Sequence, residues 1–446
     1  MRKLFLIVIG ILLMSSSFLS ANEPDESVFP YKVNYVTLEN GFKAILIPVD
    51  SPGLVAYYSV VRTGSRDEWE EGKSGFAHFF EHMMFRGTDR FPGNVYDSIV
   101  TSIGADANAY TSDDLTVYHL NFASEDLETV MDIESDRFRN LKYSLEQFQT
   151  ESGAVYGEYR KGRTSPWSVA IESLRDLAFE QHTYKHTTIG FERDVKDMPN
   201  LYDYSISFYK RYYRPENVVL LIVGDFDLKK TEEMVKKFYT PWQKGYVMPE
   251  IKNEPVQKEI KKQEINYEGR TLPLVVMSFK NDAFDPGNLK YMATYPLAEL
   301  AFGETSELYK KLVLDEQKVQ FISPDPGMAR DPYLFSVYAM VNDEKDVDYV
   351  ISEIKKTITQ FRTTAVQEDK LSGLIKREKY SFLMSLDSPD GIASSLPQYI
   401  TLTGDIKVIE EIFKSYEKIT PGVVMTAAKY YFTPERSTTV ILRGTK

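Results

Sequence analysis

Hydrophobic and polar positions of this chain follow strand and helix periods in turn, starting soon after its N-terminal segment. Residues 33–38 and 42–47 predict the two strands of a hairpin, because the Glu-Asn-Gly sequence at 39–41 is typical of a turn. Residues 54–61 form an apolar run that predicts a third strand, and residues 73–85 carry apolar positions at helical spacing. The pattern therefore indicates strands and helices mixed within one unit.

The same mixture continues through the first half of the chain. A Ser-Asp-Asp sequence at 112–114 is a turn signal that separates two short strands. Further on, Ser144 and Gln147 stand at the spacing of a capping box and mark the start of a long amphipathic helix. The elements predicted here are two strands, two helices and a strongly apolar strand, at 106–111, 115–121, 125–140, 145–163 and 217–223.

A second half of similar layout follows a segment rich in Lys, Glu and Pro at 243–263, which we interpret as a linker. A Tyr-Tyr corner ahead of an apolar strand occurs at 212–216 and again at 430–435. We therefore predict an α+β fold of two similar αβ domains, each a mostly antiparallel sheet covered by helices. Their expected bounds are 22–242 and 264–446.

The first residues have the layout of a secretory signal peptide. Arg2 and Lys3 precede an apolar run at 4–14, and small residues follow as far as Ala21. The alternative is an uncleaved anchor, but a membrane span needs about 20 apolar residues and this run is shorter. We predict a signal peptide at 1–21, export to the periplasm or cell envelope, and no stable membrane span after its removal.

Composition narrows the possible functions. The chain has 446 residues, of which 43% are hydrophobic and 26% charged, as is ordinary for a soluble globular protein. Its net charge of −12 argues against a nucleic-acid partner, which needs a basic surface. It contains no cysteine, which excludes disulfides, thiol catalysis and cysteine-ligated metals.

The sequence His-Phe-Phe-Glu-His at 78–82 is the central chemical feature. On a helix, His78 and His82 lie one turn apart on the same face, so both imidazoles can reach one ion. Glu81 lies close enough to bind a metal-held water without being a ligand. This H-x-x-E-H order is the inverzincin signature. The alternative is two partly exposed helical histidines beside a solvated acid.

Zinc requires a third protein ligand and an open position for water. The helix predicted at 145–163 offers Glu151 and Glu158, which are seven residues apart and share a face. Either of them could be the ligand or a surface carboxylate, and periodicity does not choose between them.

The remaining histidines are weaker candidates. His182 and His186 have the same spacing as the first pair, but the segment is predicted to be a loop and no acid lies between them. We expect a structural role for both. His119 lies inside a predicted strand and is expected to be an ordinary sheet residue.

The segment from Gly75 to Thr88, GFAHFFEHMMFRGT, resembles the catalytic helix of the pitrilysin family of zinc peptidases. Within that family the chain resembles bacterial relatives of the mitochondrial processing peptidase β subunit. Further matching segments are 64–68, 108–111 and 208–217. The resemblance covers most of 33–240 through specific motifs and the second half only in layout.

This resemblance implies a ligand set and a reaction. It assigns Glu158 as the third ligand of one zinc ion per chain and Glu151 as a catalytic residue that supports the site. The implied activity is that of a zinc metalloendopeptidase acting on extended or unfolded peptides, with Glu81 as general base. The domain 22–242 would then be the catalytic zinc-binding domain, and 264–446 a non-catalytic one.

The resemblance also implies a place for the peptide substrate. In such relatives the substrate lies along an edge strand of the catalytic domain, which corresponds here to 106–111. Asn108 and Ala109 would be its main-chain partners. An equally weighted interpretation of Asn108 is a strand-end residue beside a turn.

One departure from the family pattern concerns a partner. Active members carry an Arg and a Tyr, seven residues apart, that help to hold the substrate carbonyl, and Val313 and Gln320 occupy these positions here. We therefore expect a second subunit that supplies the pair and closes a clam-shell chamber of which this chain forms half. The alternatives are a non-catalytic scaffold and a peptide-binding or metal-buffering protein of the cell envelope.

Overall fold

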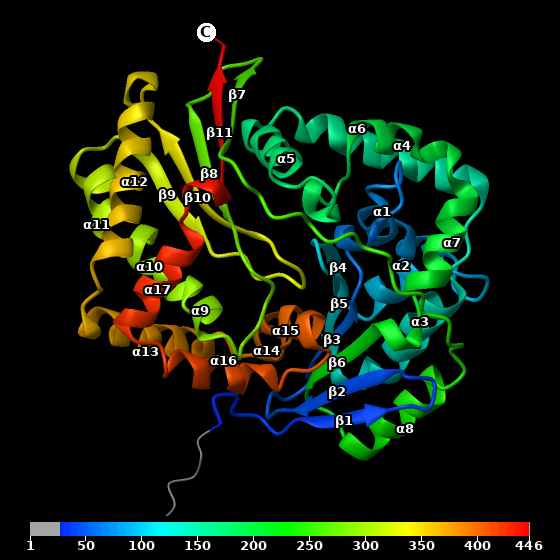
Figure 1. Cartoon of the computed structure of the whole chain (residues 1–446). Coiled ribbons are helices and arrows are strands. Elements are labelled where there is room, and N and C mark those ends of the chain that lie inside the picture. Colours follow the sequence, from blue (N-terminus) through cyan, green and yellow to red (C-terminus); the bar gives the residue numbers. More distant parts are fainter. Residues whose placement is uncertain (1–26, 446) are drawn as a thin grey trace, which may run out of the picture.

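A computed structural model describes residues 27–445, so the predicted signal peptide lies outside the described residues. Two sheets are each flanked by helices (Figure 1), which confirms the predicted α+β fold. The first sheet has the order β1-β2-β6-β3-β5-β4. Its strands are β1 (Asn34–Thr37), β2 (Lys43–Pro48), β3 (Leu54–Val61), β4 (Asp106–Thr111), β5 (Thr116–Ala123) and β6 (Val218–Gly224).

The second sheet has the order β7-β11-β8-β10-β9. In each sheet one pair of strands is parallel, β2 with β6 and β7 with β11, and the other pairs are antiparallel. The sheets are therefore mostly antiparallel, as predicted. The strands of the second sheet are β7 (Lys261–Tyr267), β8 (Leu274–Lys280), β9 (Val319–Asp325), β10 (Leu334–Val341) and β11 (Ser437–Gly444).

The predicted capping box at the start of α4 is confirmed. The Ser144 hydroxyl accepts the Gln147 N–H at 3.1 Å, and the Gln147 side chain accepts the Ser144 N–H at 2.8 Å. The first-half helices are α1 (Phe76–Met83), α2 (Gly93–Ser102), α3 (Leu127–Asn140), α4 (Leu145–Gly162), α5 (Pro166–Ala178), α6 (Glu192–Asp197), α7 (Tyr202–Tyr212) and α8 (Leu228–Tyr239).

The repeated Tyr-Tyr corner is also confirmed. In both halves a helix, α7 or α17, leads through a short 3-10 turn into an apolar strand, β6 or β11. The second-half helices are α9 (Leu289–Met292), α10 (Thr294–Phe302), α11 (Glu307–Tyr309), α12 (Val347–Thr363), α13 (Glu368–Met384), α14 (Pro389–Ser395), α15 (Pro397–Thr403), α16 (Val408–Tyr416) and α17 (Pro421–Tyr431).

The central strands of the first sheet are buried on both faces. In β3, Tyr57 packs into the core beneath α1 and α3, whereas Tyr58 and Val60 pack into a second core on the opposite face. Because both faces are covered, the strand is almost continuously apolar rather than alternating.

Each half covers part of the other half's sheet. Helix α5, from the first half, packs on β7, β8 and β11 of the second sheet. In return, α14 and α15 pack on the face of the first sheet that α1 does not cover. The hydrophobic cores on these two sheet faces therefore contain residues from both halves of the chain.

The connection between the halves has no helix or strand from Thr240 to Ile260. Glu254 in this segment accepts the N–H of His182 at 3.1 Å and contacts the Lys280 ammonium at 3.1 Å. We propose 243–263 as the linker between domains 22–242 and 264–446, and the last three residues of this linker already belong to strand β7. Within residues 27–445, no helix is both long and apolar enough to cross a membrane.

The exchange of helices makes the stability of the first sheet depend on the second half. Leu396 is fully buried beneath the first sheet, so Leu396→Ala should lower the free energy of unfolding by about 2–5 kcal/mol. Urea unfolding followed by near-UV circular dichroism should show a single transition, with its midpoint at a lower urea concentration than in the wild type. Met384→Ala, at a 76% exposed position nearby, is the control. Unfolding of one half ahead of the other would contradict the prediction.

Candidate metal centre

Helix α1 starts at a glycine with a left-handed backbone conformation, and an acid from elsewhere in the chain binds its first N–H groups. Gly75, its N-cap, has φ of +97° and offers no side chain for capping. A Cβ on Gly75 would meet the Ile189 carbonyl oxygen at 2.7 Å. The buried Glu68 carboxylate instead accepts the N–H of Gly75 at 2.7 Å and of Ala77 at 2.6 Å. Glu68 therefore fixes where the helix begins.

The two faces of α1 have different neighbours. Phe76, Phe79, Phe80 and Met83 are fully buried in the first hydrophobic core. The histidines lie on the opposite face, toward α4, with 17% and 22% of their side chains exposed. Burial of the aromatic face therefore sets the direction of the polar one.

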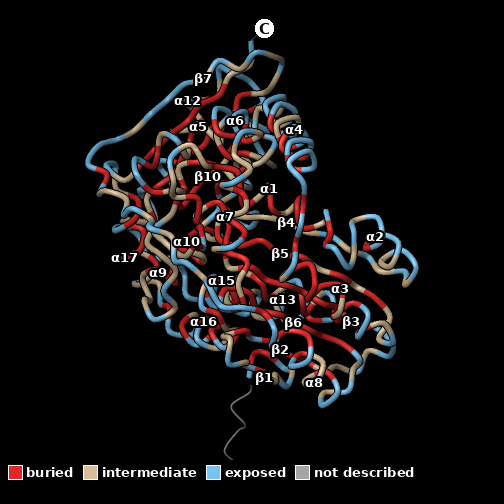
Figure 2. The backbone as a smooth tube through the Cα atoms, turned by 90° about the vertical axis from the view of Figure 1, so that its right-hand side faces the viewer, coloured by how far each residue is buried: buried red, intermediate tan, exposed pale blue. Residues whose placement is uncertain are grey.

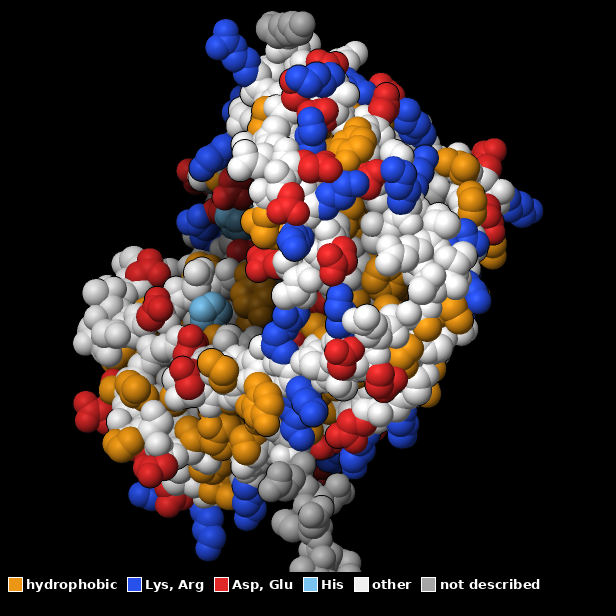
Figure 3. Space-filling model, turned by 90° about the vertical axis from the view of Figure 1, so that its left-hand side faces the viewer, with side chains coloured by type: hydrophobic (Ala, Val, Ile, Leu, Met, Phe, Trp, Pro, Cys, Tyr) orange, Lys and Arg blue, Asp and Glu red, His pale blue; other side chains and the backbone are white. Residues whose placement is uncertain are grey.

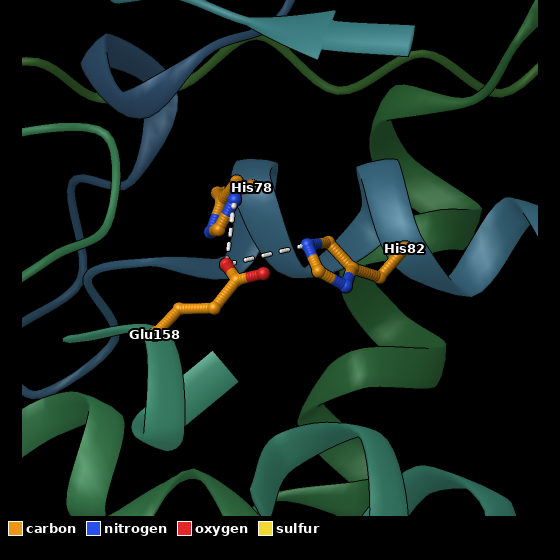
Figure 4. A group of neighbouring side chains, drawn as sticks. All are labelled: His78, His82 and Glu158. Atoms are coloured by element: carbon orange, nitrogen blue, oxygen red, sulfur yellow. Dashed lines mark ion pairs between the residues drawn. The ribbon is translucent and has the colours of Figure 1, made fainter. Parts of the chain in front are cut away.

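The structure brings His78, His82 and Glu158 together (Figure 4). Glu158 Oε2 lies 3.5 Å from His78 Nε2 and 3.6 Å from His82 Nε2. One ligand atom from each residue lies within 4.8 Å of the others. These are the three residues that the sequence and the family resemblance predict as ligands.

The donor set fits a zinc ion. Bonds of about 2.0–2.1 Å in a tetrahedral arrangement place neighbouring ligand atoms roughly 3.4 Å apart, close to the separations from Glu158. Those separations are too long for good hydrogen bonds. Three protein ligands also leave the fourth position open for water, as catalytic zinc sites require.

Glu151 contacts the other nitrogen of His82. Its Oε1 lies 2.8 Å from His82 Nδ1, and its Oε2 accepts a hydrogen bond from the Arg86 guanidinium. A proton on Nδ1 would leave the Nε2 lone pair free to face Glu158. Glu151 therefore orients a ligand, and its own side chain is only 6% exposed.

Burial favours a neutral imidazole at His78. Removal from water, together with the nearby His82, lowers the pKa of His78 to about 4. At neutral pH the ring is therefore uncharged, which is the form that binds metals. The buried Nδ1 of His78 has no hydrogen-bond partner among the described residues.

Glu81 faces the end of strand β4. Its Oε2 accepts a hydrogen bond from the Thr111 hydroxyl at 2.7 Å. Burial raises the pKa of Glu81, and the hydrogen bond from Thr111 opposes that shift. A carboxylate with a raised pKa is suited to take up a proton.

Strand β4 is an edge of the first sheet, as predicted, with β5 on one side only. Asn108 is exposed and Ala109 is half-buried. The Asn108 Oδ1 accepts the N–H of Ala109 at 2.9 Å, so an added peptide strand would have to displace this side chain from that amide. Helix α2, which precedes β4 in the chain, projects outward and is mostly exposed (Figure 2). The surface is hollowed between the two lobes, with histidine side chains in and beside the hollow (Figure 3).

The other candidate histidines lie outside the three-residue group. His182 Nε2 lies 3.0 Å from Asp331 Oδ2, and His186 Nδ1 lies 3.0 Å from the Thr187 carbonyl oxygen. His119 is in β5, where its ring stacks on Tyr58. These contacts agree with structural roles.

The two positions expected for Arg and Tyr lie in and near strand β9. Val313 is half-buried in the π-helical turn Lys310–Asp315, and Gln320 is exposed on β9. Val313 has no hydrogen-bond donor in its side chain, and Gln320 offers only a neutral amide N–H, so the two positions lack the charged donor that an Arg would supply. Gln317 between them has φ of +52°, a backbone conformation that favours glycine.

Sequence reasoning missed three residues of the site. Glu68 and Thr111 lay within segments quoted for the family resemblance, and Arg86 is one helical turn after His82. Their signal was therefore present, but their partners Gly75, Glu81 and Glu151 lie on other elements or across a turn. Spacing alone does not identify such pairs.

Comparisons with known proteins agree with this geometry. The insulinase domain of peptidase family M16 matches residues 54–191, and the domain described as peptidase M16 inactive domain matches 202–377. The zinc protease PqqE of Helicobacter pylori is 27% identical over 433 residues, covering 95% of this chain and 96% of that protein. A probable mitochondrial-processing peptidase subunit beta of Arabidopsis thaliana is 23% identical over 386 residues, covering 83% and 71%. The crystal structure of a protease from Helicobacter pylori has a TM-score of 0.87 and 25% identity, over 93% of this chain and 99% of that one.

Because Glu68 fixes the start of α1, its loss should loosen the ligands on that helix. Glu68→Gln keeps one acceptor oxygen and loses the other, so we expect affinity for a divalent metal to fall about tenfold. Competition with a chromophoric chelator measures this affinity. Asp227→Asn, which makes the same carboxylate-to-amide change in the N-cap of the distant helix α8, is the matched control. Equal metal affinity in both variants and the wild type would contradict the role of Glu68.

Proposed function

This chain belongs to peptidase family M16, the insulinase or pitrilysin family, and from that membership we propose that it is a zinc-dependent endopeptidase or the metal-bearing subunit of one. The observation that carries the proposal is the convergence of His78, His82 and Glu158 on one point. Similarity to proteins named zinc proteases supports zinc as the metal. We assign one ion to each chain.

The chemistry follows from how the residues are placed. When bound, zinc supplies a Lewis acid that polarises the scissile carbonyl and acidifies water. Glu81 takes a proton from the attacking water and delivers it to the leaving amine. Thr111 holds the Glu81 carboxylate by its hydroxyl, and Glu151 would hold His82 in the orientation that a zinc ligand needs.

We propose that extended or unfolded peptides bind along β4. An edge strand offers unpaired backbone groups, which bind main chain with little regard to side-chain identity. The strand ends at Thr111, beside Glu81, so a peptide on this edge would pass the general base. Asn108 and Ala109 would be its contacts, once the Asn108 side chain has moved from the Ala109 amide.

We further propose that the active enzyme is a heterodimer. Val313 and Gln320 leave this chain without a donor pair for the substrate carbonyl, and a partner subunit would supply an Arg and a Tyr across a closed chamber. The similarity to a protein named as a β subunit supports such a pairing. The layout of residues 1–21 favours export to the periplasm or cell envelope.

A scaffold or peptide-binding protein with the same fold is the competing function. Such a protein has no use for a general base beside three metal ligands and a buried acid that orients one of them. The retention of all these groups favours the peptidase.

Replacement of the general base separates these functions. Glu81→Gln should keep one zinc per chain and lower peptide hydrolysis by about 10²–10⁴-fold, because proton transfer is lost while the ligands remain. Zinc analysis and cleavage of an unfolded-peptide library measure the two quantities. Glu146→Gln, at an exposed position of α4, is the matched control. Undiminished hydrolysis in Glu81→Gln, or a wild type without zinc, would refute the proposal.

The heterodimer makes a separate prediction. The zinc-loaded chain alone should turn over peptides about 100-fold more slowly than the complex isolated with its natural partner, because donors to the substrate oxygen are missing. Turnover per zinc ion in both preparations measures the difference. Equal turnover would show that the chain works without a partner.

A further inference from the structure

The turn that joins β4 to β5 carries two acids that are withdrawn from solvent. Asp113 and Asp114 occupy this turn, and Asp114 is only 2% exposed. Acids in hairpin turns are usually exposed and serve the local backbone. Burying two neighbouring carboxylates costs free energy unless cations or hydrogen-bond donors from other parts of the chain contact them.

Part of that compensation comes from the first half. Arg175 of α5 donates two hydrogen bonds of 2.7 Å to the two carboxylate oxygens of Asp113. Ser65 donates a third to Asp113 at 3.0 Å. Asp113 is therefore neutralised in a two-pronged contact, and this lowers its pKa although burial raises it.

The rest comes from the second half, from the connection between β9 and β10 at residues 326–333. The Tyr333 hydroxyl donates to Asp113 Oδ2 at 3.1 Å. The Arg330 N–H donates to Asp114 Oδ2 at 2.9 Å. Tyr184, a residue of the first half, donates to Asp114 Oδ1 at 2.7 Å. The Asp331 N–H then reaches the Tyr184 hydroxyl at 3.3 Å. The connection is thus bonded to both acids of the turn.

The turn lies directly beside the proposed chemistry. Thr111, the last residue of β4, precedes it and bonds to Glu81. Because β4 pairs with β5 on one side only, its free edge has no partner strand to hold it straight. A fixed turn at the end of the strand reduces the ordering that a bound peptide must otherwise impose.

We propose that the β9–β10 connection, through Tyr333 and Arg330, is a positioning element that holds β4 in the shape that accepts an extended peptide. This inference rests on the proposed function, since it takes β4 as the peptide-binding edge. It gives a task to the part of the chain that matches the M16 inactive domain, which includes residues 326–333. The connection acts on substrate binding and leaves the metal ligands untouched.

Tyr333→Phe is the decisive variant, because it removes one hydroxyl while Arg175 still neutralises Asp113 and the ring still packs on Tyr184. In the active form of the enzyme we expect the KM for an extended peptide to rise about tenfold, with kcat within about twofold. Hydrogen exchange over 106–114 should become faster, and zinc stoichiometry should not change. Asp114→Asn, which loses one acceptor oxygen, should shift KM and exchange in the same direction.

Tyr431→Phe is the control, since it removes another buried tyrosine hydroxyl of the second half that donates to a carboxylate, that of Asp282, at 2.8 Å. If Tyr333→Phe and Tyr431→Phe gave the same KM and the same exchange over 106–114, the inference would be overturned. A wild type without zinc-dependent cleavage would refute the proposed function instead. Unaltered exchange over 106–114 in Tyr333→Phe would then still refute the positioning role.

Discussion

The short helix α1 must satisfy two demands at once, and the rest of the site depends on how it does so. One face buries the large side chains of Phe76, Phe79 and Phe80 in the first core. The other presents two imidazoles that must meet a carboxylate from α4. A helix of only eight residues has little stability of its own, so packing and the Glu68 carboxylate at its first turn set its direction. The spacing within the motif is useful only because those contacts orient it.

Much of the candidate site could be predicted because three of its residues lie close together in the sequence, at helical spacing. His78, Glu81 and His82 share one helix, and the period of that helix alone brings them together. The choice between Glu151 and Glu158 was beyond periodicity, because both lie on one face of α4. It depends on how far α4 is shifted along α1, and this shift is set by packing between distant segments. The family resemblance supplied that information, and the structure brings Glu158 to both histidine Nε2 atoms.

The fold could be predicted to a similar extent. Strands 54–61 and 106–111 have the predicted bounds, because the apolar run of the first and the turn signal that ends the second are local features. Nothing local tells α5 to cover the second sheet or α14 the first. The apolar face of an amphipathic helix predicts that the helix packs on an apolar surface, but it does not predict which surface of the protein that is. The pairing of Arg175 with Asp113 was missed for the same reason, since both residues resemble ordinary surface charges until the chain folds.

The Asn108 side chain, which covers the Ala109 amide, has a consequence beyond substrate contact. A sheet with an exposed edge strand can pair with the sheet of a second molecule and so begin to aggregate. Because its side chain already accepts the Ala109 N–H, Asn108 makes the free edge of β4 less able to pair with a strand of another molecule. A segment that forms only one or two backbone hydrogen bonds with β4 would not compensate for the loss of the bond between Asn108 and the Ala109 N–H, whereas a long extended segment would. If peptides bind along β4, the same amide would favour long extended segments over short ones, and it would also protect the isolated molecule against edge-to-edge aggregation.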